Sequence, residues 1–185
     1  MRGVIFLLAG MIGLALYAGA GCNAASDEKS VDASNGGSTH LVTVDGISLE
    51  WQLHGDSLDV TVAAPTTGWV AVGFDPSYMM KDANFIIGYV REGKVHIRDD
   101  YGSEPTYHVA DTTSAGGQDN VANKKGIEAE GRTSISFTIP LDSGDSKDRV
   151  LVPGQTYTVL LAHGGNDADD FGPNHAKRVS TTIKL

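Results

Sequence analysis

Apolar and polar residues alternate along much of the chain beyond residue 46. Ile47, Leu49, Trp51 and Leu53 fall on one face of an extended segment, with polar residues between them. A period of two is typical of a half-buried β-strand. The same kind of apolar segment, bounded by short turns, predicts further strands over residues 58–62, 69–74, 85–90, 94–98, 127–130, 133–141, 150–152, 157–162 and 177–185.

The turns between these segments are short and rich in Gly, Asp and Pro, so the pattern predicts one hairpin after another. No segment beyond the amino-terminal apolar run has the period of an amphipathic helix. We therefore expect an all-β protein, an immunoglobulin-like or jelly-roll β-sandwich of about nine to eleven antiparallel strands. Two polar segments, 99–125 and 163–174, interrupt the pattern and are expected to be loops. Long loops often carry binding residues.

The first 21 residues form a different kind of segment. After Arg2, an apolar run broken only by Gly and Ala extends from Val4 to Tyr17, and small residues precede Cys22. This arrangement predicts an export signal over residues 1–21, because the apolar part is too short for an ordinary spanning helix. Cys22 is the only cysteine, so no intramolecular disulfide can form.

The residues around Cys22 resemble a bacterial lipobox, although Gly19 stands where lipoboxes usually have leucine. The resemblance implies that Cys22 is acylated and that its lipid attaches the protein to a membrane without spanning it. Asn23, which follows the cysteine, resembles an outer-membrane address in Gram-negative lipoproteins. The expected location is the cell envelope, and the alternative is a secreted or periplasmic protein without a lipid.

Residues 22–39 contain almost nothing that could enter a core, and we expect a flexible tether there. Residues 40–185 then have the usual size of one domain. The chain carries 23 acidic and 14 basic residues, a formal net charge of −9. Such a charge repels nucleic acid, so no nucleic-acid partner is expected.

Met79 and Met80 are the only methionines beyond the export segment, and they lie between two apolar strands. A thioether at such a bend either fills a gap in the core or binds a soft metal. A histidine on a distant segment is the natural partner for the second role. His175 lies just before the last strand, and His163 ends an apolar strand and is followed by two glycines.

The order of several motifs resembles that of the DOMON domain family. These motifs are Trp69-Val-Ala-Val-Gly-Phe74, Met80-Lys-Asp-Ala-Asn-Phe-Ile-Ile-Gly-Tyr-Val90, Ile97-Arg-Asp99, Phe137-Thr-Ile-Pro-Leu141, Leu160-Leu-Ala162 and His175-Ala-Lys-Arg178. The likeness covers nearly all of residues 40–185. It implies a β-sandwich that binds either b-type haem or a sugar. In haem-binding members, a methionine after the Trp-containing strand and a histidine near the carboxyl terminus are the axial ligands.

Carried onto this chain, the resemblance implies Met80 and His175 as ligands of the haem iron. Met79 and His163 remain alternative ligands, and Trp69 and Phe85 are expected as pocket or core aromatics. The chain has no Cys-x-x-Cys-His motif, so any haem would be held without a covalent bond.

A Met/His pair fills both axial positions of the iron, which favours electron transfer over catalysis. The expected function is therefore an exported b-type cytochrome domain that passes electrons to an unidentified redox protein. The alternatives are a haem-free binding module for a sugar or other small ligand, and a module that brings a partner to the membrane. Residues 166–170 suggest calcium binding, but a solvated loop is the favoured interpretation. Asp99-Asp100 and Asp142, Asp145 and Asp148 suggest the acid and base pair of a glycoside hydrolase, but no apolar neighbours that would raise the pKa of one carboxylate are expected beside them.

Overall fold

The computed structural model describes residues 37–113, 116–172 and 174–185, all within one compact unit that extends from Ser34 to Leu185. The predicted export signal, Cys22 and most of the predicted tether lie outside the described residues. In the described part of the chain, no helix is long and apolar enough to span a membrane.

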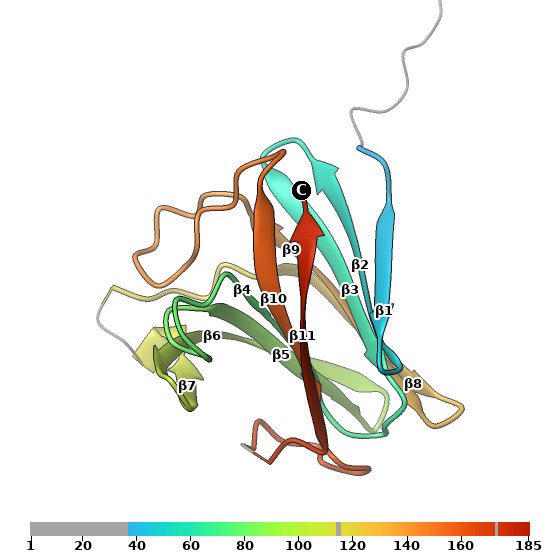
Figure 1. The fold of residues 1–185 in the computed structure, drawn as a ribbon. Helices are drawn as coiled ribbons and strands as arrows, with labels where there is room; N and C mark the ends of the chain where they lie inside the picture. Colours follow the sequence, from blue (N-terminus) through green and yellow to red (C-terminus); the bar gives the residue numbers. More distant parts are fainter. Residues whose placement is uncertain (1–36, 114–115, 173) are drawn as a thin grey trace, which may run out of the picture. The chain divides into compact units, whose positions relative to one another are not determined.

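The described residues form two antiparallel sheets, so the all-β prediction is confirmed (Figure 1). The five-stranded sheet has the order β1 (His40–Val44), β2 (Ile47–His54), β3 (Ser57–Ala64), β9 (Arg132–Pro140) and β8 (Ala122–Ala129). The six-stranded sheet has the order β11 (Lys177–Lys184), β10 (Thr156–His163), β4 (Val70–Phe74), β5 (Asn84–Arg91), β6 (Lys94–Glu104) and β7 (Tyr107–Ala110). A single 3-10 turn, η1 (Asp111–Thr113), follows β7.

Tight turns join consecutive strands where the sequence places glycine after an acidic residue. Asp45–Gly46, Glu92–Gly93 and Glu130–Gly131 all have positive φ at both positions. Two-residue turns with this backbone conformation match the right-handed twist of the flanking strands and close β-hairpins. These turns therefore set the registers of β1 with β2, β5 with β6, and β8 with β9.

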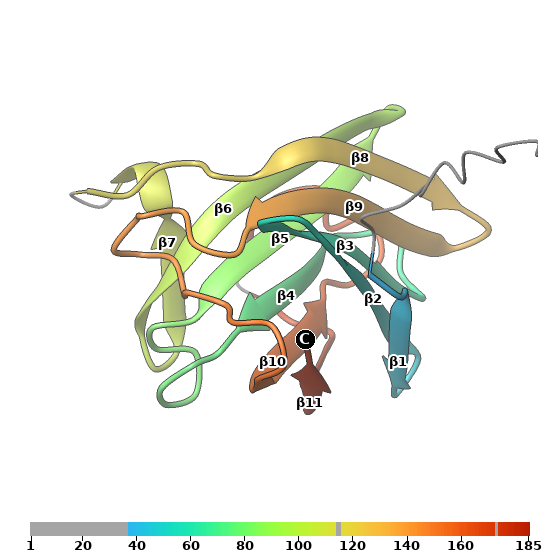
Figure 2. The ribbon, with the colours of Figure 1, turned by 90° about the horizontal axis from the view of Figure 1, so that it is seen from above.

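The main core lies between the two sheets, which face each other in Figure 2. The first sheet contributes the alternating residues of β2, β3 and β9, and the second sheet contributes those of β4, β5 and β10. The fully buried members include Ile47, Leu49, Val62, Ile135, Val70, Val72, Ile86 and Val159. This is the inward half of each period-two pattern, as expected for a sandwich.

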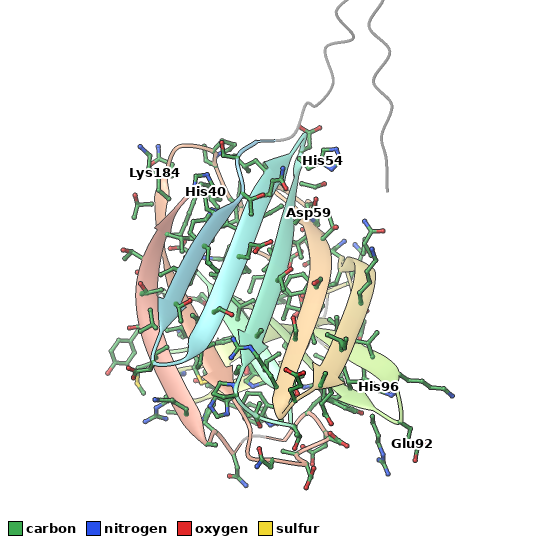
Figure 3. All side chains as sticks on the ribbon, turned by 90° about the vertical axis from the view of Figure 1, so that its right-hand side faces the viewer. His40, His54, Asp59, Glu92, His96 and Lys184 are labelled. Carbon is green, nitrogen blue, oxygen red and sulfur yellow. The ribbon has the colours of Figure 1, made fainter. Side chains whose placement is uncertain are left out.

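The outer faces of the two sheets differ in character. Polar side chains cover the outer face of the five-stranded sheet, where His54 and Asp59 lie on neighbouring strands (Figure 3). The outer face of the six-stranded sheet is apolar instead. There Trp69, Ala71 and Ile87 form a second buried cluster, packed against residues of the β10–β11 loop. The six-stranded sheet therefore has an apolar outer face that is partly covered by the β10–β11 loop.

Three details of the predicted strand pattern were wrong. Residues 99–125 are not one loop, because β6 extends to Glu104 and β7, η1 and the start of β8 follow. The side chains there are polar, and backbone pairing between β6 and β7 supplies the order that the apolar pattern did not reveal. The segment 150–152 is not a strand, and β1 was not predicted.

Candidate functional site

A cavity of about 380 Å³ opens on the outer face of the six-stranded sheet. Its floor consists of small and aliphatic residues, Ala71, Leu160 and Ala162, which come from the neighbouring strands β4 and β10. The predicted residues Met79, Met80, Phe85 and His175 line it together with Arg178. The structure thus brings the methionine segment and the distant histidine to one surface.

A second cavity of about 490 Å³ shares Met80, Thr106 and His175 with the first. Its further lining residues come mainly from β7 and include His108. Because Met80, Thr106 and His175 border both cavities, the two cavities adjoin at these residues. Both volumes lie in the range of ordinary small-molecule and cofactor sites.

The backbone of Met80 is held against the β6–β7 hairpin. Its amide donates to the carbonyl of Pro105 (3.1 Å), and the amide of Asp82 donates to the carbonyl of Gly102 (2.7 Å). A Cβ at Gly102 would lie 1.8 Å from the Met80 carbonyl oxygen, so only glycine permits this approach. Met79 has φ of +55° and is 50% exposed, whereas Met80 is half-buried and borders both cavities.

Asp82 ties the same segment to β6. The hydroxyl of Ser77 donates to one of its oxygens (2.5 Å) and the Tyr101 hydroxyl donates to the other (2.8 Å). These two hydrogen bonds lower the pKa of Asp82 below its usual value, with Ser77 the larger cause. The short segment after Met80 is therefore ordered by side chains as well as by the backbone.

His175 lies in the β10–β11 loop, against the edge of Trp69. The two rings are 5.6 Å apart and nearly perpendicular, at 74°. Trp69 is 2% exposed, and a Cβ at Gly164 would come within 2.5 Å of its indole nitrogen, so its ring is closely packed. Burial, and then the charges of Arg178 and His108, lower the pKa of His175. A lowered pKa favours the neutral imidazole, which is the form that binds metals.

His163 does not line either cavity among the described residues. It follows Val159 and Leu161 on the inward face of β10, and it is 8% exposed. Its Nδ1 donates to the carbonyl of Gly164 (2.7 Å), which satisfies that nitrogen locally. The two predicted aromatics have different roles. Phe85 lines the first cavity, and the ring of Trp69 packs against the ring of His175.

A buried charge cluster that the sequence analysis did not anticipate lies beside the second cavity. Asp100 is fully buried and accepts hydrogen bonds from the Arg98 guanidinium (2.5 and 2.7 Å) and from Nδ1 of His108 (2.5 Å). Burial opposes ionisation of Asp100, but the hydrogen bonds from His108 and Arg98 outweigh it and hold its pKa below the usual value. His108 also packs on Phe85, with 5.2 Å between the rings.

Asp99 and Asp100 are buried on β6, whereas the sequence predicted a polar loop from Asp99 onward without apolar neighbours for these carboxylates. Neighbouring residues of a strand point to opposite faces of the sheet. Asp100 points outward to His108, and Asp99 therefore points inward. The two carboxylates cannot act on one substrate as an acid and base pair. The only sequence signal for their burial is their place at the end of the strand that starts at Lys94.

A sequence model of the DOMON domain matches residues 44–164, about two thirds of the chain. The chain belongs to the DOMON family. DBH-like monooxygenase protein 1 of Homo sapiens is 25% identical over 139 residues, which are 74% of this chain and 22% of that protein. Its Mus musculus counterpart is 25% identical over 127 residues, 69% of this chain and 20% of that protein. The DOMON chain thus spans about a fifth of these relatives.

Two solved structures share the fold. The cytochrome b domain of pyranose dehydrogenase from Coprinopsis cinerea superposes with a TM-score of 0.52 at 10% identity, covering 74% of this DOMON chain and 75% of that one. The cytochrome domain of Myriococcum thermophilum cellobiose dehydrogenase superposes with a TM-score of 0.54 at 8% identity, covering 80% and 81%. At these identities the likeness concerns the fold alone.

Proposed function

We propose that this DOMON domain is a b-type cytochrome that binds one non-covalent haem between Met80 and His175 and transfers electrons. The observation that carries the proposal is the pair of adjoining cavities that share Met80 and His175 at their common border. A thioether and an imidazole from separate loops there give the donor set of a six-coordinate haem. The two structural neighbours are cytochrome domains, which points in the same direction.

The residues around the border suit a flat apolar group with charged edges. Ala71, Ala162 and Leu160 leave an apolar floor, and Phe85 adds an aromatic wall. Arg178 lines the first cavity and its exposed side chain offers a cation to the carboxylates at the edge of a porphyrin. Arg98 lines the second cavity, but its guanidinium is already paired with Asp100.

The histidine has the protonation state that iron binding requires. Burial and the neighbouring charges favour the neutral imidazole of His175, so no proton has to be displaced at neutral pH. The backbone contacts of Met80 with Pro105 and Gly102 orient the methionine before any ligand binds. Preorganised ligands of this kind bind a cofactor with a smaller entropic cost.

Haem bound in this way would supply a one-electron iron couple with a raised potential, because thioether ligation favours the reduced metal. If Met80 and His175 both held the iron, no coordination position would remain for oxygen or a substrate. We therefore assign electron transfer to the domain rather than oxygenation.

The proposed partner and location rest on the sequence pattern alone. We propose an export signal over residues 1–21, acylation of Cys22 and a place at the cell envelope, where a redox protein exchanges electrons with the domain. Globomycin treatment of the producing bacterium, which blocks removal of lipoprotein signals, tests acylation. Accumulation of the unprocessed chain supports it, and unchanged processing contradicts it.

The absorbance spectrum of the protein purified with haem supplied tests the proposed function. A Soret band with sharp α and β bands on reduction is expected, lost in Met80→Ala and in His175→Ala but retained in Met79→Ala and His163→Ala. No Soret band in the folded wild-type protein would refute the cytochrome and favour the haem-free sugar-binding alternative. Loss of the spectrum in Met79→Ala or His163→Ala alone would refute the ligand assignment and keep the function.

A further inference from the structure

Three aspartates from separate segments meet beside β7. Asp99 lies on β6, Asp111 begins η1, and Asp148 lies in the loop between β9 and β10. Each offers one carboxylate oxygen, and the three oxygens lie within 4.8 Å of one another. Figures 1 and 2 both draw the loop that follows β9 beside β6 and β7. The cluster therefore joins the paired strands β6 and β7 to the loop between β9 and β10.

Four of the six carboxylate oxygens of this cluster are buried without a hydrogen bond. Asp99 is 2% exposed and Asp111 is 0% exposed. Within the described ranges, Oδ1 of Asp99, both oxygens of Asp111 and Oδ1 of Asp148 lack any hydrogen bond. None of the three residues belongs to an ion pair there. Buried polar groups are nearly always satisfied in native proteins, so an unseen partner is expected at this point.

Electrostatics agree with that expectation. Burial raises the pKa of Asp99 to about 8 and that of Asp111 to about 7, and the Asp148 carboxylate adds to both shifts. Burial also raises the pKa of Asp148. The charge of Lys147 lowers the pKa of Asp111, but it only partly offsets the effect of burial.

Asp145, in the same loop, is a buried aspartate whose two carboxylate oxygens both accept hydrogen bonds. It is 8% exposed, and its two oxygens accept hydrogen bonds from the backbone amides of Gln118 (2.6 Å) and Lys147 (2.8 Å). The loop thus contains amide donors for a structural aspartate and directs none of them to Asp111. Carboxylate oxygens without hydrogen bonds are therefore a feature of the three clustered residues and not of every buried aspartate in this loop.

The neighbouring backbone packs tightly around the cluster. A Cβ at Gly117 would lie 2.1 Å from the carbonyl oxygen of Asp111, and the amide of Asn120 donates to Oδ2 of Asp99 (2.9 Å). Oδ1 of Asn120 is itself buried without a partner. Asn120, whose backbone amide contacts Asp99, thus has a buried oxygen of the same ligand class.

The donor set identifies the class of cation. All the available donors are oxygens, which selects a hard cation over zinc or copper. Ca²⁺ accepts an irregular set of protein oxygens at about 2.4 Å, whereas Mg²⁺ demands near-octahedral geometry and usually keeps several of its waters. We propose that Asp99, Asp111 and Asp148 bind one calcium ion, with the Asn120 amide oxygen as a further ligand.

Calorimetric titration of the purified full chain with CaCl2, after EDTA treatment and removal of the chelator, tests this proposal. One calcium ion per chain is expected to bind, with a dissociation constant between about 10⁻⁶ and 10⁻³ M, and to raise the unfolding temperature by several degrees. Asp99→Asn and Asp148→Asn are expected to weaken binding at least tenfold. Asp142→Asn removes an equal charge from an exposed residue of the same loop and should leave binding unchanged.

Stability measurements on the ion-free proteins distinguish a calcium-binding role of the aspartates from a purely structural role. In EDTA, Asp99→Asn should be at least as stable as the wild type, because the change removes a buried carboxyl group whose Oδ1 has no hydrogen-bond partner. The proposal is overturned if the folded wild type binds no calcium at 10 mM, prefers Mg²⁺, or binds calcium equally well after Asp148→Asn. Loss of stability in EDTA after Asp99→Asn, with calcium binding intact, would also overturn it and leave the aspartates as structural residues.

Discussion

Gly102→Ala should detach Met80 from the proposed iron site without unfolding the domain. The new Cβ would lie 1.8 Å from the Met80 carbonyl oxygen and 3.1 Å from the Ala83 nitrogen. Because non-bonded carbon and oxygen atoms rarely approach within about 3 Å, the Met80 segment must move by roughly 1.2 Å. Metal–ligand distances tolerate only about 0.2 Å, so the thioether can no longer occupy its position.

The expected size of the effect is a 10-fold to 100-fold loss of haem affinity, the usual result when the support of a metal ligand is lost. The free energy of unfolding should fall by about 1–3 kcal/mol, as for other overpacked sites. Haem titration followed by the Soret band measures the affinity, and urea unfolding of the haem-free protein measures the stability. The reduced spectrum should lose the sharp α band of the six-coordinate form.

Gly165→Ala is the matched control. It introduces the same methyl group in the β10–β11 loop, where no atom lies within 4 Å of the new Cβ and φ is not positive. Its haem affinity and spectrum should equal those of the wild type. A Gly102→Ala protein that binds haem with unchanged affinity and spectrum would refute the placement of Met80 at the iron.

Two further changes test the surroundings of the site. Asp100→Asn should lower the free energy of unfolding by about 3–5 kcal/mol in urea, because it leaves Arg98 beside a buried neutral group. As a control, Asp59→Asn, in the exposed pair with His54 (3.7 Å), should change the free energy of unfolding by less than about 1 kcal/mol. Equal effects of the two substitutions would contradict the assigned burial of Asp100. Calcium should slow haem transfer to apomyoglobin from the wild type but not from Asp99→Asn, and equal rates with calcium and with EDTA would argue against coupling between the two sites.

The strand pattern was predictable where burial is one-sided. β2, β3 and β9 alternate cleanly because one face meets the core and the other meets water, and their positions followed from the sequence. β7 and the end of β6 were missed because β7 has only four residues and neither segment alternates apolar with polar side chains. Their order comes from backbone pairing and from the Asp100 cluster, neither of which leaves a hydrophobic period.

The site was predictable only in part, for a related reason. The family pattern named Met80 and His175, and both residues border the same cavities. Nothing in the sequence distinguished His108 from a solvated histidine, because its burial depends on the pairing of β6 with β7. Asp99, Asp111 and Asp148 are far apart along the chain, so their convergence could only be found from the fold.

Two adjacent residues of β6 connect the proposed sites. Asp100 points outward and holds His108, which lines the second cavity, while Asp99 points inward to Asp111 directly after β7. β7 is the edge strand of its sheet and pairs with β6 alone, through an irregular register. Such a strand has few contacts of its own to keep it in place. A calcium ion bound by both Asp99 and Asp111 would link β6 to η1, the two elements that flank β7. It would thereby hold β7, including His108, against the proposed haem pocket.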